Sequence, residues 1–209
     1  MRRGAVAIVA ACAAGLAGCS AISSHAPKPP PDEGEWARVR DEATRRFELY
    51  DGFIHRATAT ATHLDERVRE ARAKRLALWF SWTDAELAAR RAAEAAEAAR
   101  FEEFVVVLYT AEKAENDLDA PRSVWRVAVE NDGAEALPVE MTALEIDLTL
   151  KGLYPWIGPF DTVYRVRFPR AVGPLTGKPF VLLLASAKGK VPLDYSVPAE
   201  KFHVPRTGP

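Results

Sequence analysis

The chain has 209 residues, of which 48% are apolar and 27% are charged. This composition is typical of folded globular domains and excludes the disordered and fibrous classes. The formal net charge of -1 gives no sign of the basic surface that nucleic-acid binding requires, so we expect no nucleic-acid partner. The two cysteines, Cys12 and Cys19, both lie near the N-terminus, and a disulfide elsewhere in the chain is therefore excluded.

The first 18 residues have the organisation of a signal peptide. Residues 2 and 3 are arginines, and the apolar run over 5–16 is shorter than the about 20 residues that a membrane-spanning helix needs. The sequence LAGC at positions 16–19 follows this run and resembles the lipobox of bacterial lipoproteins. That resemblance implies that the signal is removed before Cys19 and that the Cys19 thiol carries a diacylglyceryl group.

The implied lipid would attach the protein to a membrane through Cys19. Two or three acyl chains hold a protein durably, whereas a single chain gives only marginal binding. Ser20 stands where many inner-membrane lipoproteins have aspartate, so the resemblance favours the outer membrane, with the protein facing the periplasm. The alternative is an ordinary secreted protein cleaved at a neighbouring site, which leaves the position of Cys19 unexplained.

Residues 19–34 are predicted to be a tether, because they are rich in proline and contain almost nothing apolar. Proline-rich chains extend by about 3.1 Å per residue, so the tether could place the domain up to roughly 45 Å from the lipid. A single domain is expected over 35–209. Its first element is predicted to be an amphipathic helix over 35–50, because apolar residues recur there at steps of three and four. These residues are Trp36, Val39, Ala43, Phe47 and Tyr50.

The next two elements are a strand and a helical hairpin. Alanine and threonine alternate over 53–62, a period of two that predicts a strand. A hairpin of two helices is predicted over about 64–101, with its corner at Ser81 and Trp82 and a capping box formed by Thr83 and Glu86. We expect the charges of the second helix to form a solvated face. They are Arg90, Arg91, Glu94, Glu97 and Arg100.

From residue 103 to 198 the pattern changes to short strands separated by turn residues. The strands are predicted at 104–109, 125–129, 137–141, 144–150, 164–168, 180–184 and 191–197, with turns at 131–133 and 188–190 and a change of register near Thr142. About seven short strands resemble an immunoglobulin-like domain, which implies Greek-key order. The expected fold class is therefore α+β, a mainly antiparallel β-sandwich (53–62 plus 103–198) with an N-terminal helix and an inserted helical hairpin.

No pattern in the sequence indicates catalysis or a cofactor. The four histidines, at positions 25, 55, 63 and 203, lack metal-ligand spacing, and the acidic residues at 115, 117 and 119 lack the rest of a calcium loop. A nucleophile elbow and a phosphate-binding glycine loop are also missing. We therefore expect no metal, no cofactor and a non-catalytic role. The alternative is a periplasmic enzyme whose site is assembled only in the fold.

The most distinctive segment is the connection over 153–160, which concentrates large apolar side chains and prolines. Tyr154, Trp156, Ile157 and Phe160 are a candidate binding site for an envelope protein, because aromatic side chains bury much area at little entropic cost. The alternative is that the aromatic rings fold inward and close one end of the sandwich. The sequence thus predicts a lipid-anchored envelope protein that binds or assembles with others.

Overall fold

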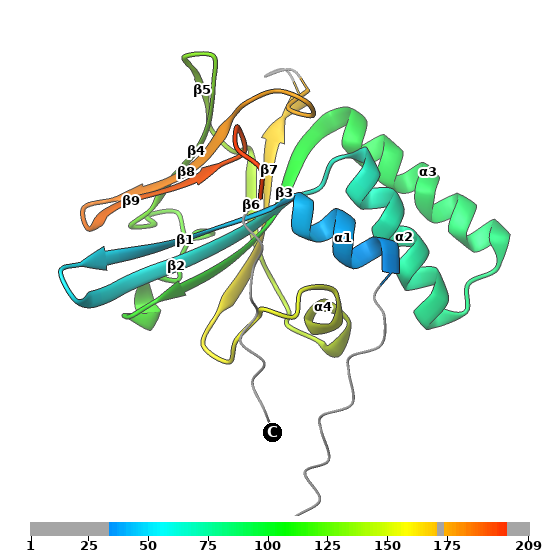
Figure 1. Ribbon diagram of the computed structural model, residues 1–209, viewed down its shortest axis with the longest axis horizontal. Coiled ribbons are helices and arrows are strands. Elements are labelled where there is room, and N and C mark those ends of the chain that lie inside the picture. Colours follow the sequence, from blue (N-terminus) through cyan, green and yellow to red (C-terminus); the bar gives the residue numbers. More distant parts are fainter. Residues whose placement is uncertain (1–33, 171–173, 200–209) are drawn as a thin grey trace, which may run out of the picture. The chain divides into compact units, whose positions relative to one another are not determined.

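The computed structural model describes residues 34–170 and 174–199, which form four α-helices and nine strands in two antiparallel sheets (Figure 1). The expected α+β class is confirmed at this level. The predicted signal peptide, Cys19, most of the tether, and the histidines at 25 and 203 lie outside the described residues. None of the described helices combines the length and the apolar character needed to cross a membrane.

The larger sheet has five strands in the order β1-β2-β3-β7-β6. Its strands are β1 (Thr44–Asp51), β2 (Ile54–His63), β3 (Phe101–Thr110), β7 (Thr162–Pro169) and β6 (Glu140–Leu144). The central strand β3 is buried on both faces, as its unbroken apolar run predicts. Phe104 and Val106 face one core, and Val105 and Val107 face another.

The smaller sheet has four strands in the order β5-β4-β8-β9. They are β5 (Ala134–Ala136), β4 (Arg126–Asn131), β8 (Val181–Ser186) and β9 (Gly189–Asp194). The predicted turn after β4 is confirmed: Asp132 and Gly133 both have positive φ, as a two-residue type I′ hairpin requires. The turn between β8 and β9 lies at 187–188, one residue earlier than predicted, because Ser186 pairs with Gly189.

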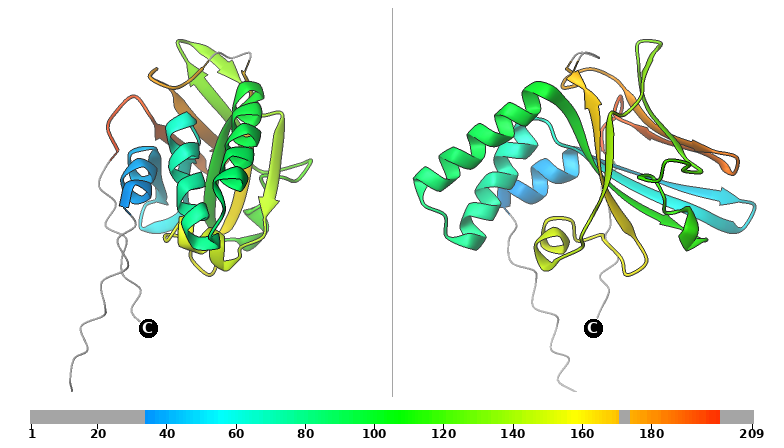
Figure 2. Two further views of the ribbon diagram at one scale, coloured as in Figure 1. Left: turned by 90° about the vertical axis from the view of Figure 1, so that its right-hand side faces the viewer. Right: turned by 180° about the vertical axis from the view of Figure 1, so that it is seen from behind.

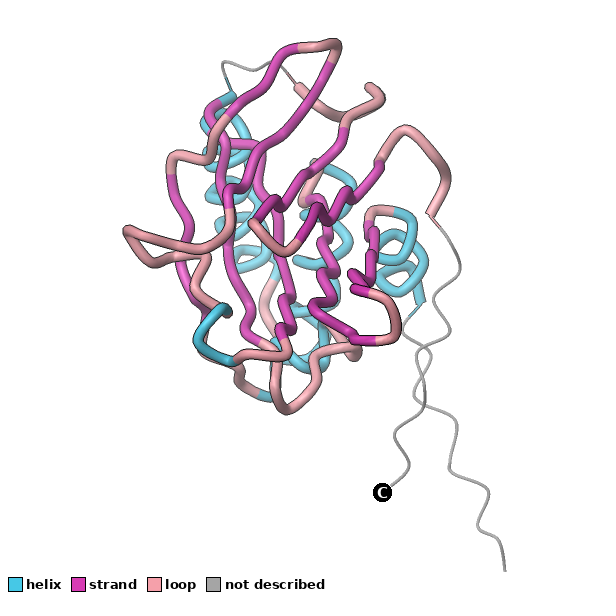
Figure 3. The backbone as a smooth tube through the Cα atoms, turned by 90° about the vertical axis from the view of Figure 1, so that its left-hand side faces the viewer, coloured by secondary structure: helices cyan, strands magenta, loops and turns pink. Residues whose placement is uncertain are grey.

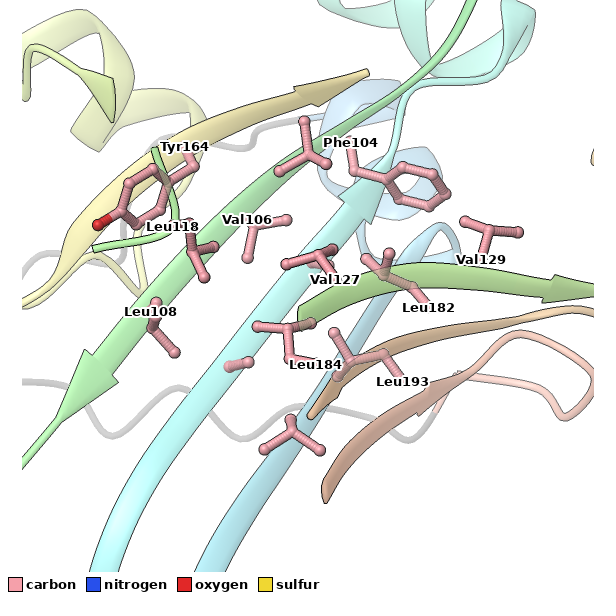
Figure 4. Close-up of a cluster of buried hydrophobic side chains, with 14 of the residues drawn as sticks. Phe104, Val106, Leu108, Leu118, Val127, Val129, Tyr164, Leu182, Leu184 and Leu193 are labelled. Carbon is pink, nitrogen blue, oxygen red and sulfur yellow. The ribbon is translucent and has the colours of Figure 1, made fainter. Parts of the chain in front are cut away.

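The two sheets enclose a common hydrophobic core (Figures 3 and 4). Figure 3 shows the strands of both sheets in front of the helices. Hydrogen bonds also link the two sheets: Arg45 Nε on β1 donates to the Asp194 carbonyl of β9 at 2.8 Å, and the hydroxyl of Tyr195, which follows β9, donates to the Ala61 carbonyl of β2 at 2.7 Å. The core residues that Figure 4 labels are all buried: Phe104, Val106, Leu108, Leu118, Val127, Val129, Tyr164, Leu182, Leu184 and Leu193.

The helices cover the opposite face of the five-stranded sheet (Figure 2). They are α1 (Gly34–Glu42), α2 (Glu66–Phe80), α3 (Asp84–Arg100) and α4 (Leu148–Leu153). The predicted helical hairpin is confirmed as α2 and α3, and so is the capping box, in which Thr83 and Glu86 bond each other's backbone. The helix–sheet core contains Trp36, Val39, Ala43, Leu64, Val68, Ala71, Val105, Val107, Leu153, Tyr154 and Val163.

Two predicted elements are wrong. The helix expected over 35–50 ends at Glu42, and β1 follows, because Phe47 and Leu49 alternate toward the core between the sheets while the residues between them face outward. The strand expected over 144–150 is instead the end of β6 followed by α4. Asp147 starts this helix, since its carboxylate accepts a hydrogen bond from the Leu150 amide.

Candidate functional site

The predicted contact loop is divided between the interior and the surface. Tyr154 is 1% exposed and packs edge-on against Trp36, with ring centroids 6.0 Å apart. Trp156 and Ile157 are half-buried against the same helix–sheet core, and the guanidinium of Arg40 lies 4.9 Å from the Trp156 ring centroid. Phe160 is 72% exposed. The inward-facing rings therefore fill the space between helices and sheet, and not the end of the sandwich.

Phe160 and three other exposed apolar side chains lie at the same end of the five-stranded sheet. We define the sheet-end surface as Tyr50, Phe53, Ile54 and Phe160, whose exposures are 53%, 106%, 55% and 72%. At this end β1 and β3 finish and β2 and β7 begin. Ala57, near the start of β2, pairs with Thr110, the last residue of β3. Phe160 lies two residues before the start of β7 and is therefore at the same end of the sheet.

The β1–β2 turn carries three of these side chains on a well-supported backbone. Asp51 pairs with Ile54, so the loop consists of Gly52 and Phe53, and Gly52 has a φ of 59°. A glycine with positive φ at the first loop position is the requirement of a type II′ hairpin. Phe53 is thus presented at the tip of a regular two-residue turn.

A stack of rings lies directly behind this turn. The ring centroids of Tyr50 and His55 are 5.0 Å apart, and those of His55 and Tyr109 are 5.3 Å apart with nearly parallel planes. His55 Nε2 also forms a 2.7 Å hydrogen bond with Thr58 Oγ1. These contacts fix the side chains behind Phe53, and a fixed surface loses less entropy when it binds.

A second exposed apolar surface lies at the far end of the helical layer. We define the helix-end surface as Leu78, Trp79, Phe80 and Leu148, with exposures of 75%, 37%, 54% and 88%. Trp79 joins its two parts, because its ring lies so close to Gly152 of α4 that a Cβ there would come within 2.8 Å. Leu148 is one turn before Gly152 and shares its helix face.

Between α2, α3 and the sheet lies a network of buried arginines and glutamates. Arg69 binds Glu94 at 2.6 Å and Glu103 at 3.4 Å, and Arg167 binds Glu103 at 3.0 Å. Glu94 also accepts from Arg72 at 2.6 Å. Burial alone would raise the pKa of the Glu94 carboxyl, but the two arginines of α2 lower it below its ordinary value.

This network corrects in part the expectation that the charges of α3 form a solvated face, which holds for the exposed Arg90, Arg91 and Arg100. Glu94 and Glu97 are half-buried and bind Arg69, Arg72 and Arg167, and Arg91 pairs with Glu70 of α2. A cavity of about 290 Å³ is lined by Arg69, Arg72, Arg167, Glu94 and Glu97 of this network and by Tyr154. Burial raises the pKa of the Tyr154 hydroxyl. The arrangement holds the helical hairpin on the sheet.

One buried pair resembles the parts of a catalytic site. His63 Nε2 lies 2.8 Å from Glu102 Oε2, and both side chains are buried. Burial would raise the pKa of the Glu102 carboxyl, but His63 and Arg170 hold it below its ordinary value. His63 lines a cavity of about 480 Å³ beside Phe180 and Tyr195. An ionised carboxylate that orients an imidazole is chemically suited to support a base.

Other candidates from the sequence are occupied by local interactions. Among residues 34–170 and 174–199, no three His, Cys, Asp or Glu side chains are grouped so that they could hold a metal ion. In the acidic loop after β3, Glu115 pairs with Lys188, and the Asp117 carboxylate accepts from Ser123 and Val124.

Two features that were not predicted have partial signals in the sequence. Glu102 and Glu103 stand at the start of an apolar strand, where a buried carboxylate needs a partner, but nothing local identifies that partner. Asp51 and Gly52 follow the helix predicted over 35–50 and suit its end, but the same residues are also typical of a hairpin turn. The helix prediction therefore gives no sign of the sheet-end surface.

Comparison with known proteins does not assign the chain to a family. No protein-family model matches it, and no curated protein does. A crystal structure of a protein of unknown function from Burkholderia pseudomallei is similar to 77% of this chain over 82% of its own length, with 14% sequence identity and a TM-score of 0.40. This similarity is too low to assign a fold family, and it carries no function.

Proposed function

We propose that this chain is a lipid-anchored protein of the cell envelope, attached through Cys19 to the periplasmic side of the outer membrane, and that it acts as a non-catalytic binding or assembly module. The sheet-end surface is its contact with an envelope protein. The observation that carries this role is the exposure of Phe53 and Phe160 on two separate loops at one end of the same sheet.

Exposed aromatic residues on a supported frame are typical of recognition surfaces. Aromatic anchors dominate the energetics of protein interfaces, whereas a single exposed apolar residue needs no explanation. Here Tyr50, Phe53 and Ile54 are adjacent on one hairpin, and the His55 stack restricts their motion. We also propose Greek-key order, since the chain passes to the smaller sheet after β3 and β7 and returns after β5.

The lipid anchor predicts a simple labelling result. In cells fed a radioactive fatty acid, the wild-type protein is expected to be labelled and Cys19→Ser is expected to be unlabelled, because the thiol is the acceptor of the diacylglyceryl group. Cys12 serves as the control, since Cys12→Ser changes only the predicted signal peptide and should leave the label in place. Label that persists in Cys19→Ser refutes the anchor.

The sheet-end surface predicts site-specific contacts in intact cells. A photo-cross-linking phenylalanine analogue at position 53 or 160 is expected to give a discrete adduct with an envelope protein, because both positions are exposed. The same analogue in place of Lys190, an exposed residue of β9, is the control and should give none. Phe53→Ala is expected to change the free energy of unfolding by less than about 0.5 kcal/mol. When it is added as a competitor, it is expected to reduce the amount of adduct less than the wild-type protein does.

Two results would contradict the role of the sheet-end surface as a contact site. If positions 53, 160 and 190 give the same pattern, or if Phe53→Ala unfolds the domain, the sheet-end surface is not a contact site. The lipid label is measured on the same cells, so a failed anchor and a failed contact surface are separate results.

The enzyme alternative is supported by the His63–Glu102 pair. Within the described residues, Glu102 is the one hydrogen-bond partner of the His63 ring, and the neighbouring Ser196 hydroxyl donates to Asp194. The described carboxyl groups with displaced pKa values, such as those of Glu94, Glu102 and Glu140, are all displaced downward. A carboxylic general acid requires the opposite displacement, so these carboxyl groups are not suited to that one role.

A further inference from the structure

We infer that the helix-end surface rests on the phospholipid bilayer that carries the Cys19 anchor, with Leu78, Phe80 and Leu148 in contact with the lipid interface. This inference rests on the proposed anchor and adds an orientation to it. The helical end of the domain faces the membrane, and the sheet-end surface faces away from it toward the partner.

The path of the chain brings the anchor to this end of the domain. Described residues begin at Gly34, and the adjacent Glu35 carboxylate lies 3.3 Å from Lys74 Nζ on α2. Leu78 is four residues beyond Lys74, a distance of about 6 Å along the helix. The chain that leads to Cys19 therefore leaves the domain about one helical turn from the helix-end surface.

The length of that chain limits where the membrane lies. Cys19 precedes Gly34 by 15 residues, which span at most about 50 Å when fully extended. In Figure 1 the turn between α2 and α3 lies at the right of the domain and the β1–β2 turn at the left. The anchor thus starts on the side of the helix-end surface, and the sheet-end surface is the more distant of the two.

The chemistry of the helix-end surface suits a lipid interface. Tryptophan rings and cationic side chains are enriched at the level of lipid headgroups. Arg75 lies 4.8 Å from the Trp79 ring centroid, and Arg90 lies 5.3 Å from that of Trp82. These arginines can reach phosphates while the apolar side chains enter the interface.

Acidic groups at the same end limit the contribution of anionic lipid. Asp84 and Glu86 begin α3, and Asp147 begins α4. The Glu86 carboxylate is engaged by Thr83 and is held ionised by that backbone hydrogen bond, which lowers its pKa. We therefore expect apolar contact to dominate, so that binding persists on zwitterionic bilayers.

The test uses the full-length lipidated protein in vesicles with brominated acyl chains, which quench tryptophan at the interface. Two reporters are compared, Leu148→Trp on the helix-end surface and Phe53→Trp on the sheet-end surface. Both replaced side chains are exposed, so neither change disturbs the core. Brominated phosphatidylcholine alone and a mixture with phosphatidylglycerol are used as bilayers.

The fluorescence of each reporter is taken as the difference from the native protein, which contains five tryptophans of its own. The expected result is a loss of most of this added fluorescence for Leu148→Trp and little loss of it for Phe53→Trp, in both kinds of vesicle. In Trp79→Phe, the quenching of the native protein is expected to fall, because Trp79 is the native reporter of this surface. Equal quenching of the two reporters, or none at position 148, overturns the inference and leaves the helix-end surface to a protein partner. Flotation of the same samples measures the anchor separately, because protein that fails to float with vesicles contradicts the proposed lipid attachment itself.

Discussion

Trp36→Ala is expected to lower the free energy of unfolding by about 3 to 5 kcal/mol, the range found when a large buried ring is truncated. Trp36 is 2% exposed, and its indole Nε1 donates to the Leu153 carbonyl at 3.2 Å. Its ring also packs edge-on against Tyr154. Alanine would leave a cavity between α1 and α4 and a buried carbonyl with one partner fewer. Chemical denaturation followed by circular dichroism measures the change.

Two controls separate packing from other effects of this change. Trp36→Phe keeps an apolar ring and removes the indole donor, so we expect a smaller loss of about 1 to 2 kcal/mol. Leu148→Ala truncates an 88% exposed side chain and should stay within about 0.5 kcal/mol. A loss below about 1 kcal/mol for Trp36→Ala would show that the Trp36 ring does not stabilise the domain by packing.

The parts of the fold that the sequence predicted are those governed by local rules. Thr83 and Glu86 form the expected capping box because both groups lie within one turn of the same helix. Asp132 and Gly133 form the expected turn because each tolerates positive φ. Strand β3 was predicted from a run of apolar residues that only a doubly buried strand needs.

The two wrongly predicted elements lie where the apolar pattern fits both the helical period and the strand period. Ala43, Phe47 and Tyr50 lie at helical steps, but Phe47 and Leu49 also alternate as a strand does. Pairing with β2 decides between these possibilities, and that pairing is a tertiary contact. In the same way, the residues over 144–150 fit a strand until the Asp147 cap starts α4.

The candidate surfaces could not be predicted because their members are distant in sequence. Phe53 and Phe160 are placed at one end of the sheet only by the pairing of β2, β3 and β7. Trp79 meets Gly152 only after α2 and α4 have both docked. The sequence did identify Phe160 as a candidate, since it concentrates with other aromatic residues in one loop.

Glu103→Gln is expected to lower the free energy of unfolding by about 3 kcal/mol, because it removes the most buried carboxylate of the network and leaves Arg69 and Arg167 each with one negative partner fewer. The Glu103 carboxylate lies 3.4 Å from Arg69 Nη2 and 3.0 Å from Arg167 Nε. All three side chains are at most 14% exposed. Glutamine has nearly the same shape, so the loss reports charge and not a cavity. Denaturant unfolding at neutral pH measures it.

Glu140→Gln is the matched control, because Glu140 binds the same Arg167 at 3.2 Å but is 35% exposed. At such an exposed position water can solvate the arginine in place of the lost carboxylate, so the expected loss in the free energy of unfolding is at most about 1 kcal/mol. Since Glu103 links Arg69 on α2 to Arg167 on β7, the larger loss should also appear as faster hydrogen exchange in α2 and α3. Equal losses for the two variants would mean that water already reaches Glu103, and the helical hairpin would then be held on the sheet by its apolar contacts alone.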